Sequence, residues 1–340
     1  MVYFAARMGR YWRGRGDMSE KSTIQWTDAT WSPVTGCSKV SPGCDNCYAI
    51  KESNRHRNLP KYAGLVQNGD WTGEVRCHPD LACEPLKWKK PKRIFVCSMS
   101  DLFHSNVPWE FIIKVFDVMR ECPQHTFQLL TKRPGRMAHF AEYVWPLPWP
   151  DNVWAGTSVE SQKYAPRIDC LLRVPAKVRF ISAEPLLEPL NIKPYFFKCT
   201  GCGQIPCDCE GVAIQQVIIG GESGPGARPM SLNWARDIVE QCDTSGVAAF
   251  VKQMGSAPMS DLDDQALWER LIDLALSSDG VKLSDNLGNT FRRGVGGIRL
   301  GHYLKFHDLK GGIMDEWPES LRRREFPCTT NILTKKKAMA

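Results

Sequence analysis

Short apolar runs recur along the middle of the chain, and each is followed directly by polar residues. Their short length and their content of β-branched and aromatic residues predict buried strands rather than helices. The clearest runs are Ile94–Cys97, Thr126–Leu130, Val153–Ala155, Val178–Ile181, Gln215–Ile219 and Ala248–Val251.

Helical stretches separate these runs. The best defined is predicted over Val107–Glu121, with Asn106 or Ser105 as the capping residue, Pro108 in the first turn and Pro123 just past the end. Another helix is expected to begin at Tyr48. The helix over Val107–Glu121 has an apolar face that consists of Trp109, Ile112, Val115, Phe116 and Met119.

Strands that alternate with helices indicate βα units and a parallel sheet. Counting a first short strand near Trp31–Val34, we predict an α/β fold with a partial (β/α)6 TIM-like barrel, and a last strand at Ala248–Val251. Functional groups of such folds gather at the carboxyl ends of the strands. The polar residues expected there are Asp101, Lys132, Ser158, Glu160, Glu184 and Glu222.

Three parts of the chain differ in pattern. Residues 1–25 form a basic N-terminal extension, and residues 26–255 hold the predicted barrel with a cysteine-rich insertion at about 197–211. Residues 256–340 are expected to form an appendage with a basic tail. Repeated glycines interrupt this last part, in which Leu267–Leu276 is a plausible amphipathic helix.

Composition and charge narrow the class of protein. A chain of 340 residues that is 43% hydrophobic can bury a large core. The chain contains no apolar run long enough to cross a bilayer and no signal peptide, so we expect a cytoplasmic protein without a membrane partner. The net charge of +7 lies mostly in the two ends, where it offers only non-specific attraction to phosphate.

Three cysteines, Cys37, Cys44 and Cys47, lie close together before the first predicted helix. Gly36 and Pro42 make this segment a loop. A structural zinc site needs four protein ligands, whereas an iron–sulfur cube held by three cysteines leaves one iron open. The open iron is our main hypothesis; half of a disulfide framework, zinc with a distant fourth ligand, and core thiols are the alternatives.

A second group of four cysteines lies in the predicted insertion. Their spacing favours a complete zinc site. An auxiliary iron–sulfur cluster or unmetallated thiols are the alternatives. The four residues are Cys199, Cys202, Cys207 and Cys209.

The first cysteine loop resembles that of a phage and prophage three-cysteine-motif family related to radical S-adenosylmethionine (SAM) enzymes. The resemblance is carried by Trp26-Thr, by Thr35-Gly-Cys and by Pro42-Gly-Cys-Asp-Asn-Cys-Tyr-Ala, and it extends to about Pro327. The sequence departs from the commonest radical SAM motif, C-x3-C-x2-C, because the first gap is six residues. Asn46 also stands where that motif has an aromatic residue.

This resemblance implies a radical SAM barrel in which Cys37, Cys44 and Cys47 hold a [4Fe-4S] cluster that cleaves SAM reductively. A flavodoxin or ferredoxin would supply the electron, and the resulting radical would take hydrogen from a substrate. The family context suggests a phage DNA base or its hypermodified substituent as substrate, with an isomerase-type or lyase-type reaction in the host cytoplasm.

The resemblance also implies roles for the strand-end residues. Thr131-Lys132 is similar to the strand end of spore photoproduct lyase-like members. We therefore expect Glu184, Glu222 and Lys132 to be catalytic. Contacts with SAM are expected from Ser98, Ser100, Asp101, Ser158 and Glu160.

The competing hypothesis is a zinc-binding module that holds nucleic acid and has no catalytic activity. Its best support is the basic run Lys87–Arg93, in which Trp88 could stack on a base. The carboxylates expected together at the carboxyl ends of the strands argue against this hypothesis, because they repel phosphate.

Overall fold

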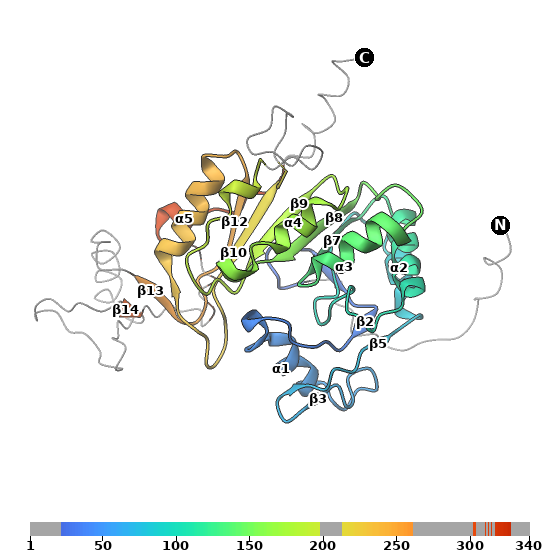
Figure 1. Ribbon diagram of the computed structural model, residues 1–340. Helices are drawn as coiled ribbons and strands as arrows, with labels where there is room; N and C mark the ends of the chain where they lie inside the picture. Colours follow the sequence, from blue (N-terminus) through green and yellow to red (C-terminus); the bar gives the residue numbers. More distant parts are fainter. Residues whose placement is uncertain are drawn as a thin grey trace, which may run out of the picture.

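A seven-stranded, all-parallel sheet organises the computed structural model, which describes residues 22–197, 213–260, 302–303, 310, 312, 314 and 317–327. The strands follow one another in chain order. The sheet curls into a half-barrel, and β1 and β12 are its two edge strands (Figure 1). The strands are β1 (Ala29–Trp31), β6 (Arg93–Val96), β7 (Thr126–Thr131), β8 (Val153–Ser158), β9 (Arg179–Ala183), β10 (Gln216–Gly220) and β12 (Ala248–Gln253).

The βα architecture predicted from the sequence is confirmed, although the sheet has seven strands rather than six. The seventh strand is β12, which contains the predicted last strand Ala248–Val251, pairs with β10 in parallel and continues the same curl. Each predicted apolar run coincides with a strand to within a few residues at its ends. The predicted first strand near Trp31–Val34 is divided between β1 and the short strand β2 (Val34–Thr35).

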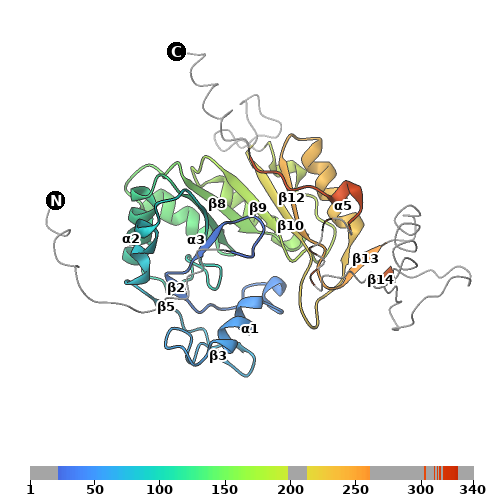
Figure 2. The same ribbon diagram turned by 180° about the vertical axis from the view of Figure 1, so that it is seen from behind.

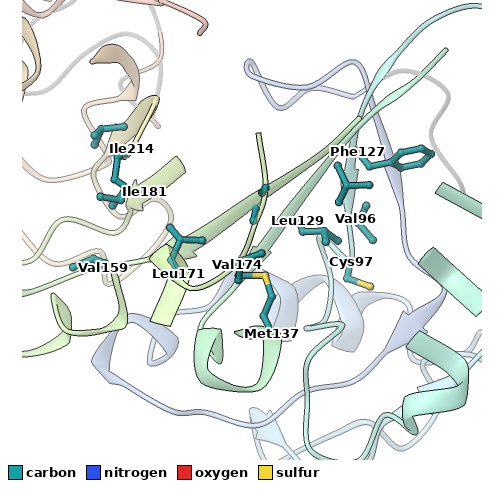
Figure 3. Close-up of a cluster of buried hydrophobic side chains, with 14 of the residues drawn as sticks. Val96, Cys97, Phe127, Leu129, Met137, Val159, Leu171, Val174, Ile181 and Ile214 are labelled. Carbon is teal, nitrogen blue, oxygen red and sulfur yellow. The ribbon is translucent and has the colours of Figure 1, made fainter. Parts of the chain in front are cut away.

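Helices cover the convex face of the sheet. Ile181 and other outward residues of the strands form the main core with the apolar faces of these helices. Figure 3 shows part of this core, with Met137 near Val174 and Leu129. The helices are α2 (Trp109–Glu121), α3 (Pro134–His139), α4 (Arg167–Leu172) and α5 (Leu232–Asp243).

Helix α2 begins two residues later than predicted. Pro108 has an extended backbone, with φ −62° and ψ 146°, so it precedes the helix instead of forming its first turn. Helix α5 has a side-chain cap, because the Ser231 hydroxyl accepts a hydrogen bond from the Asn233 N–H at 3.2 Å. No helix among the described residues is both long and apolar enough to span a bilayer.

Aromatic side chains fill the concave face at the amino end of the strands. Successive residues of a strand face opposite sides of the sheet, so Trp154 and Phe180 point inward while their neighbours face the helices. Gly156 leaves space for a ring: a Cβ there would stand 2.4 Å from Phe180. This inner layer comprises Trp26, Phe95, Trp154, Val178, Phe180, Ile218 and Phe250.

The chain between β1 and β6 forms a separate group of small elements beside the half-barrel (Figures 1 and 2). It contains the cysteine loop, defined here as residues 36–47, followed by α1 (Tyr48–Arg55). A bridge between Gly36 and Ser100 attaches the loop to the segment after β6. The small strands pair antiparallel as β2 with β5 (Arg76–Cys77) and β3 (Val66–Gln67) with β4 (Asp70–Trp71).

The described end of the chain returns to the half-barrel. The Val251 N–H donates to the Arg323 carbonyl at 2.8 Å, and the Glu325 N–H donates to the Ala249 carbonyl at 3.0 Å. The Phe326 ring packs edge-on against Phe250, with centroids 5.3 Å apart. Residues 323–326 therefore line the outer edge of β12.

Three further short strands lie outside the half-barrel sheet. They form a sheet of their own in the order β11 (Met230–Ser231), β13 (Pro258–Ser260) and β14 (His302–Tyr303).

Candidate active site

A cavity of about 490 Å³ lies between the cysteine loop and the inward-facing ends of the strands. Trp26, Phe95 and Leu130 give part of its wall an apolar character. The rest of the wall is polar, since the inward positions change from aromatic to polar toward the carboxyl ends of the strands. The sequence-predicted site residues that line it are Cys37, Cys44, Cys47, Ser98, Ser100, Asp101, Lys132, Ser158, Glu184 and Glu222.

Asp101 connects two strand ends with the start of the cysteine loop. Its carboxylate accepts hydrogen bonds from the Thr131 hydroxyl at 2.7 Å and from Arg133 Nη1 at 2.9 Å. Arg133 in turn donates to the Ser38 carbonyl at 2.9 Å, and its Nη1 lies 3.7 Å from Cys37 Sγ. Asp101 and Arg133 thus hold the first cysteine against the barrel.

A second pair holds the other end of the loop. Glu222 accepts from Arg228 Nη2 at 2.7 Å and from Asn46 Nδ2 at 2.8 Å. Arg228 also donates to the Pro42 carbonyl at 2.8 Å. Burial alone would raise the pKa of Glu222, but the hydrogen bonds from Arg228 and Asn46 outweigh it and hold that pKa below its ordinary value.

Glu160 supports the middle of the loop from behind. It is fully buried, does not line the cavity, and pairs with Arg167 Nη1 at 2.9 Å. A Cβ at Gly43 would lie 2.8 Å from the Glu160 side chain, so only glycine allows the loop to approach so closely. In this structure the Glu160 side chain is enclosed behind the loop, and the SAM contact expected of it stays a prediction.

These three pairs, Asp101–Arg133, Glu160–Arg167 and Glu222–Arg228, are called the loop clamps below. The sequence analysis did not predict the three arginines as site residues. Only Arg133 could have been predicted, since it lies directly after the end of a predicted strand. Asn46, which departs from the commonest radical SAM motif, has a structural role here because it joins the loop to Glu222.

Two predicted serines differ in their bonding. The Ser100 hydroxyl donates to the Val34 carbonyl at 2.7 Å, which braces the segment that carries the loop. At Ser98 the backbone carbonyl accepts a hydrogen bond from the Tyr48 hydroxyl. Both residues line the cavity, but Ser100 already uses its hydroxyl proton within the protein.

His104, in the segment after β6, also contacts the loop. Its Nδ1 accepts from the Asn106 N–H at 3.1 Å, so Nε2 carries the proton and donates to the Ser38 hydroxyl at 2.8 Å. Burial lowers the pKa of His104, and the nearby Arg133 acts in the same direction, which favours the neutral ring.

The three loop thiols line one cavity but do not form a ligand group. No three His, Cys, Asp or Glu side chains of the described residues are arranged to hold a metal ion. Burial raises the pKa of Cys37 to about 11 and also raises that of Cys47, while Arg133 acts against the rise at Cys37. Three thiols on one loop fit an iron–sulfur cluster as a donor set; loss of their protons would accompany binding.

Three polar side chains of the wall have unused bonding capacity within the described part of the chain. Lys252 Nζ donates to Glu184 Oε1 at 2.6 Å, and each side chain is 18% exposed. The Lys132 ammonium lines the cavity and has no hydrogen-bond or ion-pair partner within the described part of the chain. Lys252 was not predicted as a site residue, although it directly follows a predicted strand.

Other sequence-level expectations fall elsewhere. Trp88 is buried, 7% exposed, and its ring lies edge-on to His125, so it cannot stack on a nucleic-acid base from this position. That expectation was wrong because the ring fills the core at the amino end of β6. The predicted helix Leu267–Leu276 lies outside the described residues, as does the proposed zinc group of Cys199, Cys202, Cys207 and Cys209.

Comparisons with known proteins give one family and several distant structures. Spore photoproduct lyase complexed with dinucleoside spore photoproduct is 12% identical, with a TM-score of 0.35 over 84% of this chain and 72% of that one. A spore photoproduct lyase mutant with bound AdoMet and dinucleoside spore photoproduct is also 12% identical, with a TM-score of 0.35 over 83% and 69%. TM-scores of this size do not establish a shared fold.

No curated protein matches the chain. The family model described as "Protein of unknown function (DUF5131)" matches residues 21–318, and the chain therefore belongs to that family.

Proposed function

We propose that this protein is a radical SAM enzyme that takes hydrogen from a substrate bound in the half-barrel. The observation that carries the proposal is the position of the cysteine loop. Cys37, Cys44 and Cys47 all line the cavity at the carboxyl ends of the parallel strands, where α/β folds assemble their active sites.

In this proposal Cys37, Cys44 and Cys47 hold a [4Fe-4S] cluster. When bound, such a cluster supplies the electron for reductive cleavage of SAM, with a flavodoxin or ferredoxin as the donor. The loop clamps keep the three cysteines against the strand ends. Asp101 and Glu222 are then positioning residues, since arginines and neighbouring groups occupy their carboxylates. Glu160 is a positioning residue through its bond to Arg167 and its packing behind Gly43.

The remaining polar wall would bind SAM and the substrate. The Lys132 ammonium, which has no hydrogen-bond partner among the described residues, would meet a carboxylate, and Ser98 and Ser158 line the same cavity. The apolar wall at Trp26 and Phe95 limits the access of water to a reactive radical. The proposed substrate is a DNA base or a substituent attached to one, as the resemblance of the cysteine motif implies, and the reaction is of the isomerase or lyase type.

The test is anaerobic purification followed by measurement of iron, sulfide and zinc. We expect brown protein with broad absorbance at about 400 nm. When SAM and a reductant are added, the protein should release 5′-deoxyadenosine. Cys44→Ala should abolish both the absorbance and the release. Cys170→Ala is the matched control, because Cys170 is a free, partly buried thiol outside the cavity.

Two results would contradict the proposal. One is colourless protein that holds zinc at the cysteine loop, which would favour the non-catalytic zinc module. The other is an iron–sulfur protein in which Cys44→Ala leaves both the cluster absorbance and the 5′-deoxyadenosine release unchanged.

A further inference from the structure

Glu184 and Lys252 form an ion pair on the cavity wall, at the carboxyl ends of strands β9 and β12. Glu184 directly follows β9, and Lys252 lies one residue before the end of β12. Lys252 Nζ is 2.6 Å from Glu184 Oε1, and Gln253 Nε2 approaches the same oxygen at 3.4 Å. Neither residue contributes to the loop clamps.

The bonding of this pair differs from that of the other carboxylates on the wall. Asp101 accepts four hydrogen bonds, and both oxygens of Glu222 are occupied. Within the described residues, Glu184 Oε2 accepts no hydrogen bond and Lys252 Nζ donates only one. Burying an ion pair costs desolvation energy, which further hydrogen bonds to the two charged groups must offset. Glu184 Oε2 and the unused N–H groups of Lys252 are therefore available to hydrogen-bond a ligand.

The free atoms define the chemistry of that ligand. A carboxylate oxygen accepts, and the adjacent ammonium donates, so together they complement an N–H group next to a C=O group. The pair is neutral overall, and an ionised ligand group would have to separate its two partners. The apolar side chains of Trp26, Phe95 and Leu130 line the same cavity and suit a flat ring.

We propose that Glu184 and Lys252 bind the amide edge of a neutral, planar substrate, such as a lactam or cyclic imide ring. This inference rests on the proposed function in taking the cavity as the active site. The binding step itself needs neither a cluster nor SAM, so it can fail or succeed independently of the radical chemistry.

The experiment titrates the full-length protein with 2-pyridone, which has the N–H beside the C=O, and with N-methyl-2-pyridone, which lacks the donor. Saturation-transfer NMR reports binding of each probe. We expect 2-pyridone to bind about tenfold more tightly than the N-methyl compound, as for a hydrogen bond to a charged group.

The double variant Glu184→Met/Lys252→Met replaces both partners by apolar side chains of similar length, which is expected to be nearly neutral for folding. It should bind 2-pyridone about tenfold more weakly than the wild type does. The matched control is Asp151→Leu/Lys177→Met, which removes an ion pair outside the cavity. It should bind both probes as the wild type does.

The proposal is overturned if 2-pyridone does not bind, if the two pyridones bind equally, or if the double variant, folded by circular dichroism, retains wild-type binding. Tighter binding of benzoate or benzylamine than of 2-pyridone would also overturn it, in favour of an ionised ligand. The comparison of the two pyridones on the wild type holds even if the double variant does not fold. Because the probes are titrated without SAM or reductant, their binding is measured separately from the radical chemistry.

Discussion

Asp101 and Glu184 are carboxylates on the same cavity wall, yet their surroundings give them different tasks. Asp101 is saturated by an arginine, a threonine hydroxyl and two backbone N–H groups, and it holds the cysteine loop. Glu184 has a single close partner, Lys252, and keeps one oxygen free within the described structure. A carboxylate at a strand end is therefore a candidate ligand contact only when its own protein has not already used its oxygens.

The largest loss of stability, and the strongest test of this comparison, is expected when the Asp101 carboxylate is removed. Asp101→Ala leaves the Arg133 guanidinium, which is 14% exposed, without its counter-charge, so the free energy of unfolding should fall by about 3–5 kcal/mol. Urea denaturation followed by circular dichroism measures the change. Asp151→Ala, which breaks the exposed pair with Lys177, should cost less than about 1 kcal/mol. Equal losses for the two variants would remove the distinction between a clamp and an ordinary surface pair.

Replacing Glu222 should loosen the other end of the loop. Glu222→Gln weakens its bonds to Arg228 and Asn46 and should lower the free energy of unfolding by about 2 kcal/mol. Amide hydrogen exchange should become faster in Pro42–Cys47, while Glu52→Gln, another acid on the cavity wall, should leave it unchanged. Unchanged exchange in Glu222→Gln would mean that the loop does not depend on this clamp.

The pH dependence of stability gives a third test. Because the pKa of Glu222 is lowered in the folded state, its ionised form stabilises the fold above the ordinary carboxyl pKa. This contribution is lost as the pH falls through the lowered value. The stability difference between the wild type and Glu222→Gln should be full at about pH 7 and should shrink toward about pH 3. A difference that does not vary with pH would exclude a role for the charge.

The smallest effect is expected at Glu184. Glu184→Gln keeps a hydrogen-bond acceptor for Lys252 and anchors no loop group, so the free energy of unfolding should change by about 1 kcal/mol or less. Hydrogen exchange in the cysteine loop should match that of the wild type. A loss as large as that of Asp101→Ala would show that Glu184 is also a structural anchor.

The sequence predicted the sheet well because strand periodicity is local. Runs such as Thr126–Leu130 are short, apolar and bounded by polar residues, and the structure places them in adjacent parallel strands. The same logic put the polar residues at the carboxyl ends of the strands, where most of them do line one cavity.

The sequence could not show which of these polar groups are already occupied. Arg167 and Arg228 lie in segments with no periodic signal, and only the folded chain brings them to Glu160 and Glu222. The burial of Glu160 has a similar origin, since it depends on how closely Gly43 approaches from more than a hundred positions away in the chain. Such pairings depend on tertiary geometry rather than on local pattern.

The segment 323–326, which pairs with β12, limits where the chain can be truncated. A fragment ending at residue 255 would lose the backbone bonds that Arg323 and Glu325 make to that strand, together with the Phe326 ring over Phe250. It would present a bare strand flank and an uncovered aromatic ring to water, a combination that invites self-association. Recombinant versions intended to report on the half-barrel should therefore retain residues through Phe326.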